Sequence, residues 1–97
     1  DRFFLDPGHM APMLYAQLAL IGKFSIEGLQ QLRQWGSPTP GHPEVDFARG
    51  IENTSGPLGQ GHVFAVGAAI AAKFLAARTA NPTFEKETIY AYISDGG

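Results

Sequence analysis

The segment from Gly36 to Gly61 limits the possible folds of this chain more than any other feature. It holds four of the seven prolines and six of the twelve glycines among 97 residues. Proline fixes φ and lacks a backbone donor, and glycine weakens helices and strands. A stretch this long without regular structure is uncommon in a compact domain and is usually functional. We therefore expect shaped loops here, which carry a binding or catalytic site.

Helices and a strand are predicted on both sides of this segment. Pro12 fits only in the first turn of a helix, so that helix begins near His9 or Met10, and Gly22 ends it. Ser25 is the N-cap of the next helix. The predicted elements are a buried strand end or extended lead-in over residues 1–6, helices over 9–21, 26–35 and 60–78, and a strand over 88–94. This pattern predicts an α/β chain, mostly helices and long loops with one clear strand.

The predicted third helix is apolar on all sides, because Lys73 is the one charged residue between Val63 and Ala77. A helix without a polar face has to be buried on all sides. As a membrane span it is too short, since about 20 apolar residues are needed. We expect it to pack inside a large protein or at a subunit interface.

Composition excludes several classes of function. Apolar residues make up 44% and charged residues 16%, which is a globular balance. A net charge of −2 implies no basic face for nucleic acid. Cysteine is absent, which excludes disulfides, thiolate zinc sites and cysteine nucleophiles. Trp35 and the other aromatic residues do not alternate with basic residues, so we assign them to the core.

A carboxylate directly follows the predicted strand 88–94, in the run Ser94-Asp95-Gly96-Gly97. Ligands of open α/β sheets bind at the carboxyl ends of strands. Glycines there let backbone N–H groups approach a phosphate, and the aspartate can hold a hard divalent cation. An ordinary Asp-Gly turn explains the same residues, and the motif alone leaves both interpretations open.

A glycine-rich loop, GPLGQG at residues 56–61, precedes the predicted third helix. Such a loop can expose backbone groups or aim a helix N-terminus at an anion. It lacks the Lys-Ser/Thr ending of a P-loop and the spacing of the dinucleotide fingerprint. A tight connection into a buried helix remains the alternative.

Two histidines stand in braced positions. His9 follows Pro7-Gly8, and His42 lies in a proline-rich loop. A fixed imidazole suits hydrogen bonding to phosphate or hydroxyl groups, or proton transfer near neutral pH. As isolated histidines, both also fit structural roles. His62 is interpreted as a packing or capping residue, whereas Arg33 and Arg49 are candidates for contact with a phosphorylated ligand.

The order of these motifs resembles the N-terminal, diphosphate-binding domain of transketolases, which are thiamine-diphosphate enzymes. The segments that carry the resemblance are DRF at 1–3, PGH at 7–9, SIE at 25–27, TPGHPE at 39–44, GPLGQG at 56–61 and SDG at 94–96. The resemblance covers essentially the whole chain. The resemblance implies that residues 1–97 are a partial thiamine-diphosphate domain of a longer chain, with a parallel sheet flanked by helices.

The resemblance implies roles for five of these residues. His9 would lie near the cofactor diphosphate and the substrate, and His42 would contact hydroxyls of the donor sugar, so both are candidate catalytic residues. The backbone of the loop at Gly56, Pro57 and Leu58 would face the aminopyrimidine ring of the cofactor.

The resemblance also implies a metal site. Asp95 would bind the divalent ion, Mg²⁺ or Ca²⁺, and Gly96 would lie near the diphosphate. The chain departs from the family pattern on either side of this pair. Ser94 stands where the first glycine of Gly-Asp-Gly is usual, and Gly97 stands where cysteine is commoner.

The function implied is transfer of a two-carbon ketol unit from a ketose phosphate to an aldose phosphate, with thiamine diphosphate as cofactor. The implied setting is a cytoplasmic homodimer of the pentose phosphate pathway, in which sugar phosphates, the rest of the chain and a second subunit are the partners. Nucleic acid and membrane are not expected partners. The 97 residues alone are expected to be inactive. Two alternatives stay open: another thiamine-diphosphate enzyme, such as a deoxyxylulose-phosphate or dihydroxyacetone synthase, and a non-catalytic interaction module.

Overall fold

Two short parallel strands form the centre of the structure, a computed structural model that describes residues 1–95. Strand β1 (Arg2–Leu5) pairs with β2 (Ile89–Tyr92), and Leu5 lies opposite Tyr92. Parallel strands need a long crossover, which the whole intervening chain provides. The predicted α/β class with a parallel sheet is confirmed. Of the two interpretations left open for residues 1–6, the strand is confirmed, because Arg2–Leu5 pairs with β2.

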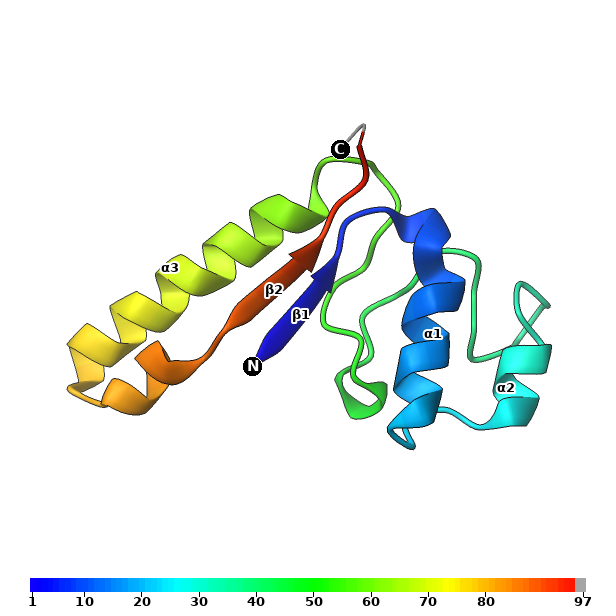
Figure 1. Cartoon of the computed structure of the whole chain (residues 1–97), viewed down its shortest axis with the longest axis horizontal. Coiled ribbons are helices and arrows are strands. Elements are labelled where there is room, and N and C mark those ends of the chain that lie inside the picture. The colour runs from blue at the N-terminus through cyan, green and yellow to red at the C-terminus, as the bar shows by residue number, and fades with distance from the viewer. Residues whose placement is uncertain (96–97) are drawn as a thin grey trace.

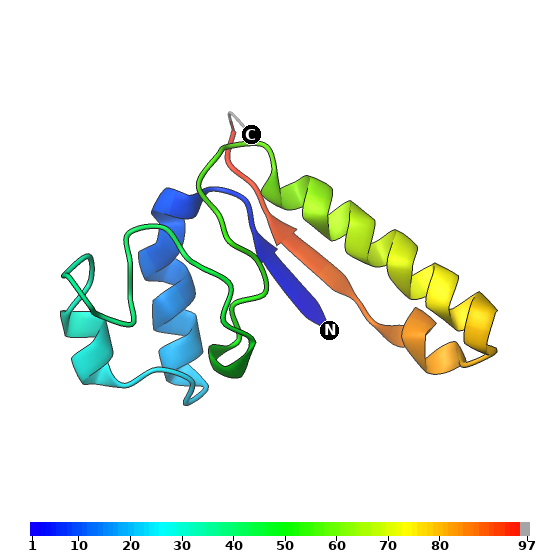
Figure 2. The same ribbon diagram turned by 180° about the vertical axis from the view of Figure 1, so that it is seen from behind.

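The helices flank this sheet on two sides. Figure 1 shows α3 along one side of the strands and α1 with α2 on the other, and Figure 2 shows the same arrangement from behind. The α-helices are α1 (Ala11–Leu20), α2 (Ile26–Gln30) and α3 (Gly61–Thr79), and the short 3₁₀ helices are η1 (Gly8–Met10), η2 (Phe47–Arg49) and η3 (Pro82–Lys86). The predicted helices over 9–21 and 60–78 are confirmed. The segment 36–61 is largely irregular, as expected, and before α3 begins it contains η2 and an isolated bridge between Asp46 and Ile51.

The hydrophobic core lies between β1, α1 and the loop that carries Ile51. Its buried members are Leu5, Ala11, Leu14, Tyr15, Leu18, Phe24 and Ile51. The rings of Tyr15 and Phe24 pack with centroids 5.4 Å apart. The core therefore fixes α1 to the edge of the sheet opposite β2.

That edge of β1 is closed by side chains rather than by a third strand. Successive backbone groups of a strand point to opposite edges, and those of Leu5 point away from β2. Asn53 accepts a hydrogen bond from the Leu5 N–H at 3.1 Å and donates one to the Leu5 carbonyl at 3.0 Å. Glu52 accepts from the backbone N–H of Phe3. Side chains of the irregular segment 52–55 thus take the hydrogen-bonding place of a third strand along β1.

The second helix is shorter than the predicted 26–35, because α2 ends at Gln30. The Thr39 hydroxyl donates to the Gly28 carbonyl at 2.8 Å, an acceptor that a continuing helix would use for its own backbone. Beyond this point, Arg33 takes a left-handed φ of 64° and its N–H donates to the Thr39 carbonyl at 2.9 Å. The returning loop therefore ends the helix.

The assignment of all aromatic residues to the core is wrong. Trp35 is fully exposed, and Phe47 and Phe74 are largely exposed. Trp35 lies beyond the end of α2, so no helix directs its indole toward α1. Within the chain, Tyr15 and Phe24 contribute aromatic rings to the core.

Only a narrow side of α3 is covered within the described chain. Its buried residues are Gly61, Ala65, Ala72 and Ala76, whereas Val66, Ile70 and Phe74 are exposed. The helix has 19 residues and is long and apolar enough to cross a membrane by length and composition alone. The argument that it is too short is therefore corrected, although the test is weak evidence that soluble core helices also pass. Burial of the exposed face in a larger assembly stays a prediction.

Gly61 allows α3 to begin directly against β1. A Cβ atom there would lie 2.7 Å from the Leu5 carbonyl oxygen and 2.8 Å from the Asp6 nitrogen. We expect Gly61→Ala to destabilise the fold by about 1–3 kcal/mol, because the backbone must move. Thermal unfolding followed by circular dichroism measures this loss.

Gly67 provides the matched control in the same helix, since a Cβ there meets nothing within 4 Å. Gly67→Ala should raise the free energy of unfolding by up to about 1 kcal/mol, because alanine is the better helix former. Equal effects of the two substitutions would contradict the tight contact at Gly61.

Candidate functional site

Three motif segments meet beyond the carboxyl ends of the strands: residues 7–9 after β1, residues 56–61 before α3, and residues 94–95 after β2. The parallel register places Asp6 at the same end of the sheet as Ser94 and Asp95, and the Asp6 N–H donates to the Tyr92 carbonyl at 2.9 Å. Both views show the turn after β1, the loop before α3 and the chain after β2 together at this end (Figures 1 and 2). Ligands of α/β sheets bind at this edge, which makes it the candidate site.

Gly8 lies where these segments cross. A Cβ atom on Gly8 would lie 2.9 Å from the Gly56 nitrogen and 3.0 Å from Cδ2 of His42. A Cβ atom on Gly56 would lie 3.7 Å from Nδ1 of His42. The structure thus brings the His42 imidazole against glycines of two motifs that are far apart in the sequence.

The loop that carries His42 is held on both sides. The Tyr15 hydroxyl donates to the Pro40 carbonyl at 2.6 Å, which ties the loop to α1. After the histidine, the Ser55 N–H donates to the Pro43 carbonyl at 3.0 Å, and the Pro43 ring is fully buried. The His42 imidazole is exposed, and the loop backbone on both sides of it is held by hydrogen bonds. Such an arrangement suits a group that must contact a ligand in one orientation.

The other predicted site residues that the structure describes lie at this edge, and most of them are open to solvent. The exposed ones are His9, Pro57, Leu58 and Asp95, whereas Gly56 is half-buried. Gly96 lies outside the described residues. The roles of these residues toward a cofactor stay predictions.

The predicted metal site at Asp95 is not formed by residues 1–95 alone. No group of three or more His, Asp or Glu side chains in this range is placed to hold a metal ion. Asp95 is thus a single carboxylate, whereas Mg²⁺ and Ca²⁺ take six or more oxygen ligands. The Ser94 hydroxyl is buried and has no hydrogen-bond partner among the described residues. A buried hydroxyl of this kind fits a site that a polar ligand completes.

The amino end of α3 already faces a carboxylate. Asp6 is fully buried, and it accepts hydrogen bonds from the Gly59 N–H at 2.8 Å and from Nδ1 of His62 at 2.7 Å. The hydrogen bond from His62 holds the pKa of Asp6 below its usual value, against the effect of burial. Asp6 is thus one anion that this helix N-terminus faces, since an Asp6 oxygen also lies 3.4 Å from the backbone nitrogen of His62. The suggestion that the helix N-terminus aims at an external anion stays a prediction.

Asp6 was not predicted as a functional residue. The signal for it was its place directly after the apolar run of β1, where a carboxylate is expected to be buried. A buried carboxylate needs hydrogen-bond partners, which points to a specific role. His62 was predicted as a packing or capping residue. The structure confirms its place in the first turn of α3 and adds Asp6 as its partner.

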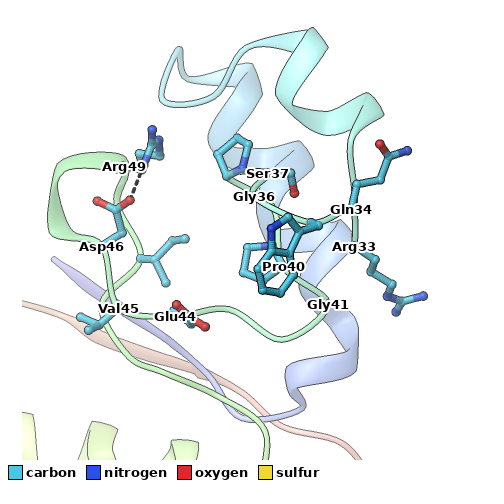
Figure 3. Close-up of a pocket in the computed structure, with 13 residues that line it drawn as sticks. Arg33, Gln34, Gly36, Ser37, Pro40, Gly41, Glu44, Val45, Asp46 and Arg49 are labelled. Carbon is cyan, nitrogen blue, oxygen red and sulfur yellow. Dashed lines mark hydrogen bonds and ion pairs between the residues drawn. The ribbon is translucent and has the colours of Figure 1, made fainter.

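A cavity of about 670 Å³ lies over residues 33–51 (Figure 3). Arg33 and Arg49 both line it, but Nη1 of Arg49 is held by Asp46 at 2.6 Å. Figure 3 shows the Arg33 guanidinium directed away from Arg49. The two arginines therefore do not converge on one ligand here.

The fold and the edge define an α/β unit of the class that binds ligands at the carboxyl ends of parallel strands. The family model described as "Transketolase, thiamine diphosphate binding domain" matches residues 1–97. The chain belongs to this family, and the resemblance drawn from its motifs is confirmed.

Relatives and solved structures agree with this assignment. The chain is 50% identical to transketolase of Streptococcus pyogenes serotype M6 over 97 residues, which is 99% of the chain and 13% of the relative. It is 53% identical over 100 residues to transketolase-1, chloroplastic, of Arabidopsis thaliana, at 99% and 14% coverage. A solved transketolase from Leishmania mexicana matches with a TM-score of 0.89 at 43% identity, at 99% and 15% coverage. The chain thus spans only about one seventh of these proteins.

The Tyr15 hydroxyl gives a testable link between α1 and the His42 loop. Burial, with a smaller effect of Glu44, raises the pKa of Tyr15 to about 12. The unfolded value is about 10, so the stabilisation is complete below pH 10 and is lost as the pH rises toward 12. We expect Tyr15→Phe to lower the free energy of unfolding by about 1 kcal/mol at neutral pH and to reduce its alkaline decline.

Urea unfolding at a series of pH values measures both effects. Tyr90→Phe is the control at neutral pH, because Tyr90 is half exposed and should change stability by less than about 0.5 kcal/mol. An alkaline decline as steep in Tyr15→Phe as in the wild type would show that this phenol does not titrate as described.

Proposed function

We propose that the complete protein transfers a two-carbon ketol unit from a ketose phosphate to an aldose phosphate, and that this chain forms part of its thiamine diphosphate site. The observation that carries the proposal is the meeting of His42, Gly8 and Gly56 at the sheet edge, in a chain of this family. Solved transketolases of Pichia stipitis, 45% identical to the chain, are described as complexes with fructose 6-phosphate and sedoheptulose 7-phosphate. These complexes support sugar phosphates as substrates.

The glycine-lined edge fits the cofactor. Gly8 is buried so closely against Gly56 and His42 that a side chain on Gly8 would not fit. Gly56 is half-buried and carries no side chain, so in this proposal its backbone is open to a ligand. Thiamine diphosphate supplies the carbon that holds the transferred unit. In this proposal the backbone of Gly56, Pro57 and Leu58 binds its aminopyrimidine ring, and Gly96 lies near its diphosphate.

Asp95 is proposed to hold Mg²⁺ or Ca²⁺. An exposed carboxylate at a strand tip suits a hard cation, and diphosphate oxygens and residues outside this chain would complete its coordination. The Ser94 hydroxyl beside it has no hydrogen-bond partner within residues 1–95, which supports a polar ligand at this position.

The two exposed imidazoles are proposed to act on the substrate. His42 would hydrogen-bond the hydroxyls of the donor sugar, and His9 would lie near the substrate and the diphosphate. An imidazole can also accept and return a proton near neutral pH. The rigid loop that carries His42 supports an orienting role.

The proposed setting is a cytoplasmic homodimer of the pentose phosphate pathway. The exposed apolar face of α3 supports only a covering partner, because a face of that kind needs a covering surface from the rest of the chain or from a second subunit. The compartment and the pathway are proposed from the family alone. The same face favours a second candidate function, in which the 97 residues act only as an interaction module.

Asp95→Ala in the complete protein tests the site. Loss of the carboxylate should abolish metal-dependent binding of thiamine diphosphate, measured by titration calorimetry in the presence of Mg²⁺. Glu85→Ala is the control, because this exposed carboxylate lies in η3, next to the carboxyl end of α3 rather than at the site edge. Wild-type affinity in Asp95→Ala would remove the basis for the metal site.

The isolated chain and the reaction products separate the remaining alternatives. Residues 1–97 alone should not bind the cofactor tightly, because the site is incomplete, and tight binding would contradict a shared site.

Product analysis of the complete protein with ribose 5-phosphate, pyruvate or formaldehyde as acceptor or donor distinguishes a transketolase from the other thiamine-diphosphate enzymes.

A further inference from the structure

We infer that Asp6 and His62 form a positioning pair that holds the loop of residues 56–61 in the shape required for cofactor binding. The inference rests on the proposed function, because it assigns a purpose to the geometry of the proposed pyrimidine-binding loop. Neither side chain is proposed to touch the cofactor.

The contacts of Asp6 reach the loop directly. One carboxylate oxygen accepts from the Gly59 N–H at 2.8 Å, and the other accepts from Nδ1 of His62 at 2.7 Å. Gly59 has a left-handed φ of 84°, so this hydrogen bond holds the residue at which the loop turns. Gly59 adjoins Leu58, which places the fixed point beside the proposed cofactor contact.

The burial of Asp6 makes these hydrogen bonds strong. The carboxylate is fully buried, and a buried charge without partners would be costly. A carboxylate only accepts hydrogen bonds, so Nδ1 of His62 carries the proton between them. The carboxylate also faces the amino end of α3, where the helix dipole favours a negative charge.

The backbone leaves the pair little freedom. Gly61 packs directly against the backbone of Leu5 and Asp6, which brings the start of α3 close to the end of β1. The Asp6 side chain is therefore close enough to hydrogen-bond the loop before the helix. The His62 side chain is partly exposed, whereas the carboxylate that it contacts is fully buried. The loop, the strand end and the helix start are thus joined at one carboxylate.

The test compares substitutions in the complete protein by calorimetry with thiamine diphosphate and Mg²⁺. We expect Asp6→Asn to weaken cofactor affinity by about tenfold or more, because it removes the charge from these hydrogen bonds. At saturating cofactor, kcat should stay within about twofold of the wild type, since a positioning defect appears in binding. His62→Ala should weaken affinity by about threefold to tenfold.

His62→Asn is the conservative rescue, because the asparagine amide can donate from a place close to that of Nδ1. It should restore affinity to near the wild-type value. Glu52→Gln is the matched control: its carboxylate also accepts from the β1 backbone and from Arg2, but at the opposite end of the strand. This control should lower the melting temperature without weakening cofactor affinity.

The outcomes separate the inference from the proposed function. Wild-type protein that fails to bind thiamine diphosphate would overturn the proposed function. If the wild type binds, but Asp6→Asn and His62→Ala bind equally well, the positioning pair is overturned and the function stands. If Asp6→Asn does not fold, the comparison of His62→Ala with His62→Asn decides, and equal affinities of these two variants would overturn the inference.

Discussion

The close contact between the end of β1 and the start of α3 is the constraint that places the glycine-rich loop of the site. Gly61 permits the contact, since a Cβ atom there would meet the backbone of Leu5 and Asp6. Asp6 then supplies hydrogen-bond partners for the loop before the helix. A helix start, a strand end and a loop are thereby placed within one small region, and the glycine-lined edge results from that placement.

Side-chain hydrogen bonds give the irregular loops a rigidity that their backbone lacks. Asn53 pairs with both backbone groups of Leu5, and Tyr15 holds the carbonyl of Pro40. Each bond joins residues far apart in the sequence, so each contributes to the fold only when the whole unit has assembled. The exposed His42 imidazole thus lies on a loop that is fixed by buried polar groups rather than by secondary structure.

Local signals predicted most of the elements, and long-range contacts account for what they missed. Pro12, Gly22 and Ser25 placed helix ends correctly, because caps and breakers act within one turn. The early end of α2 depends on a hydroxyl supplied by Thr39, which no local pattern reveals. Asp6 was missed for the same reason, since its partners lie more than fifty residues away. The motifs of the site were found individually, whereas their meeting at Gly8 required coordinates.

The position of segment 52–55 along β1 also determines at which edge of the sheet a further strand could pair. One edge of β1 is blocked by asparagine and glutamate side chains, which satisfy the backbone without offering a new ladder. The other edge is taken by β2. Any strand contributed from elsewhere in the protein would therefore have to join alongside β2, so that the sheet extends in a single direction.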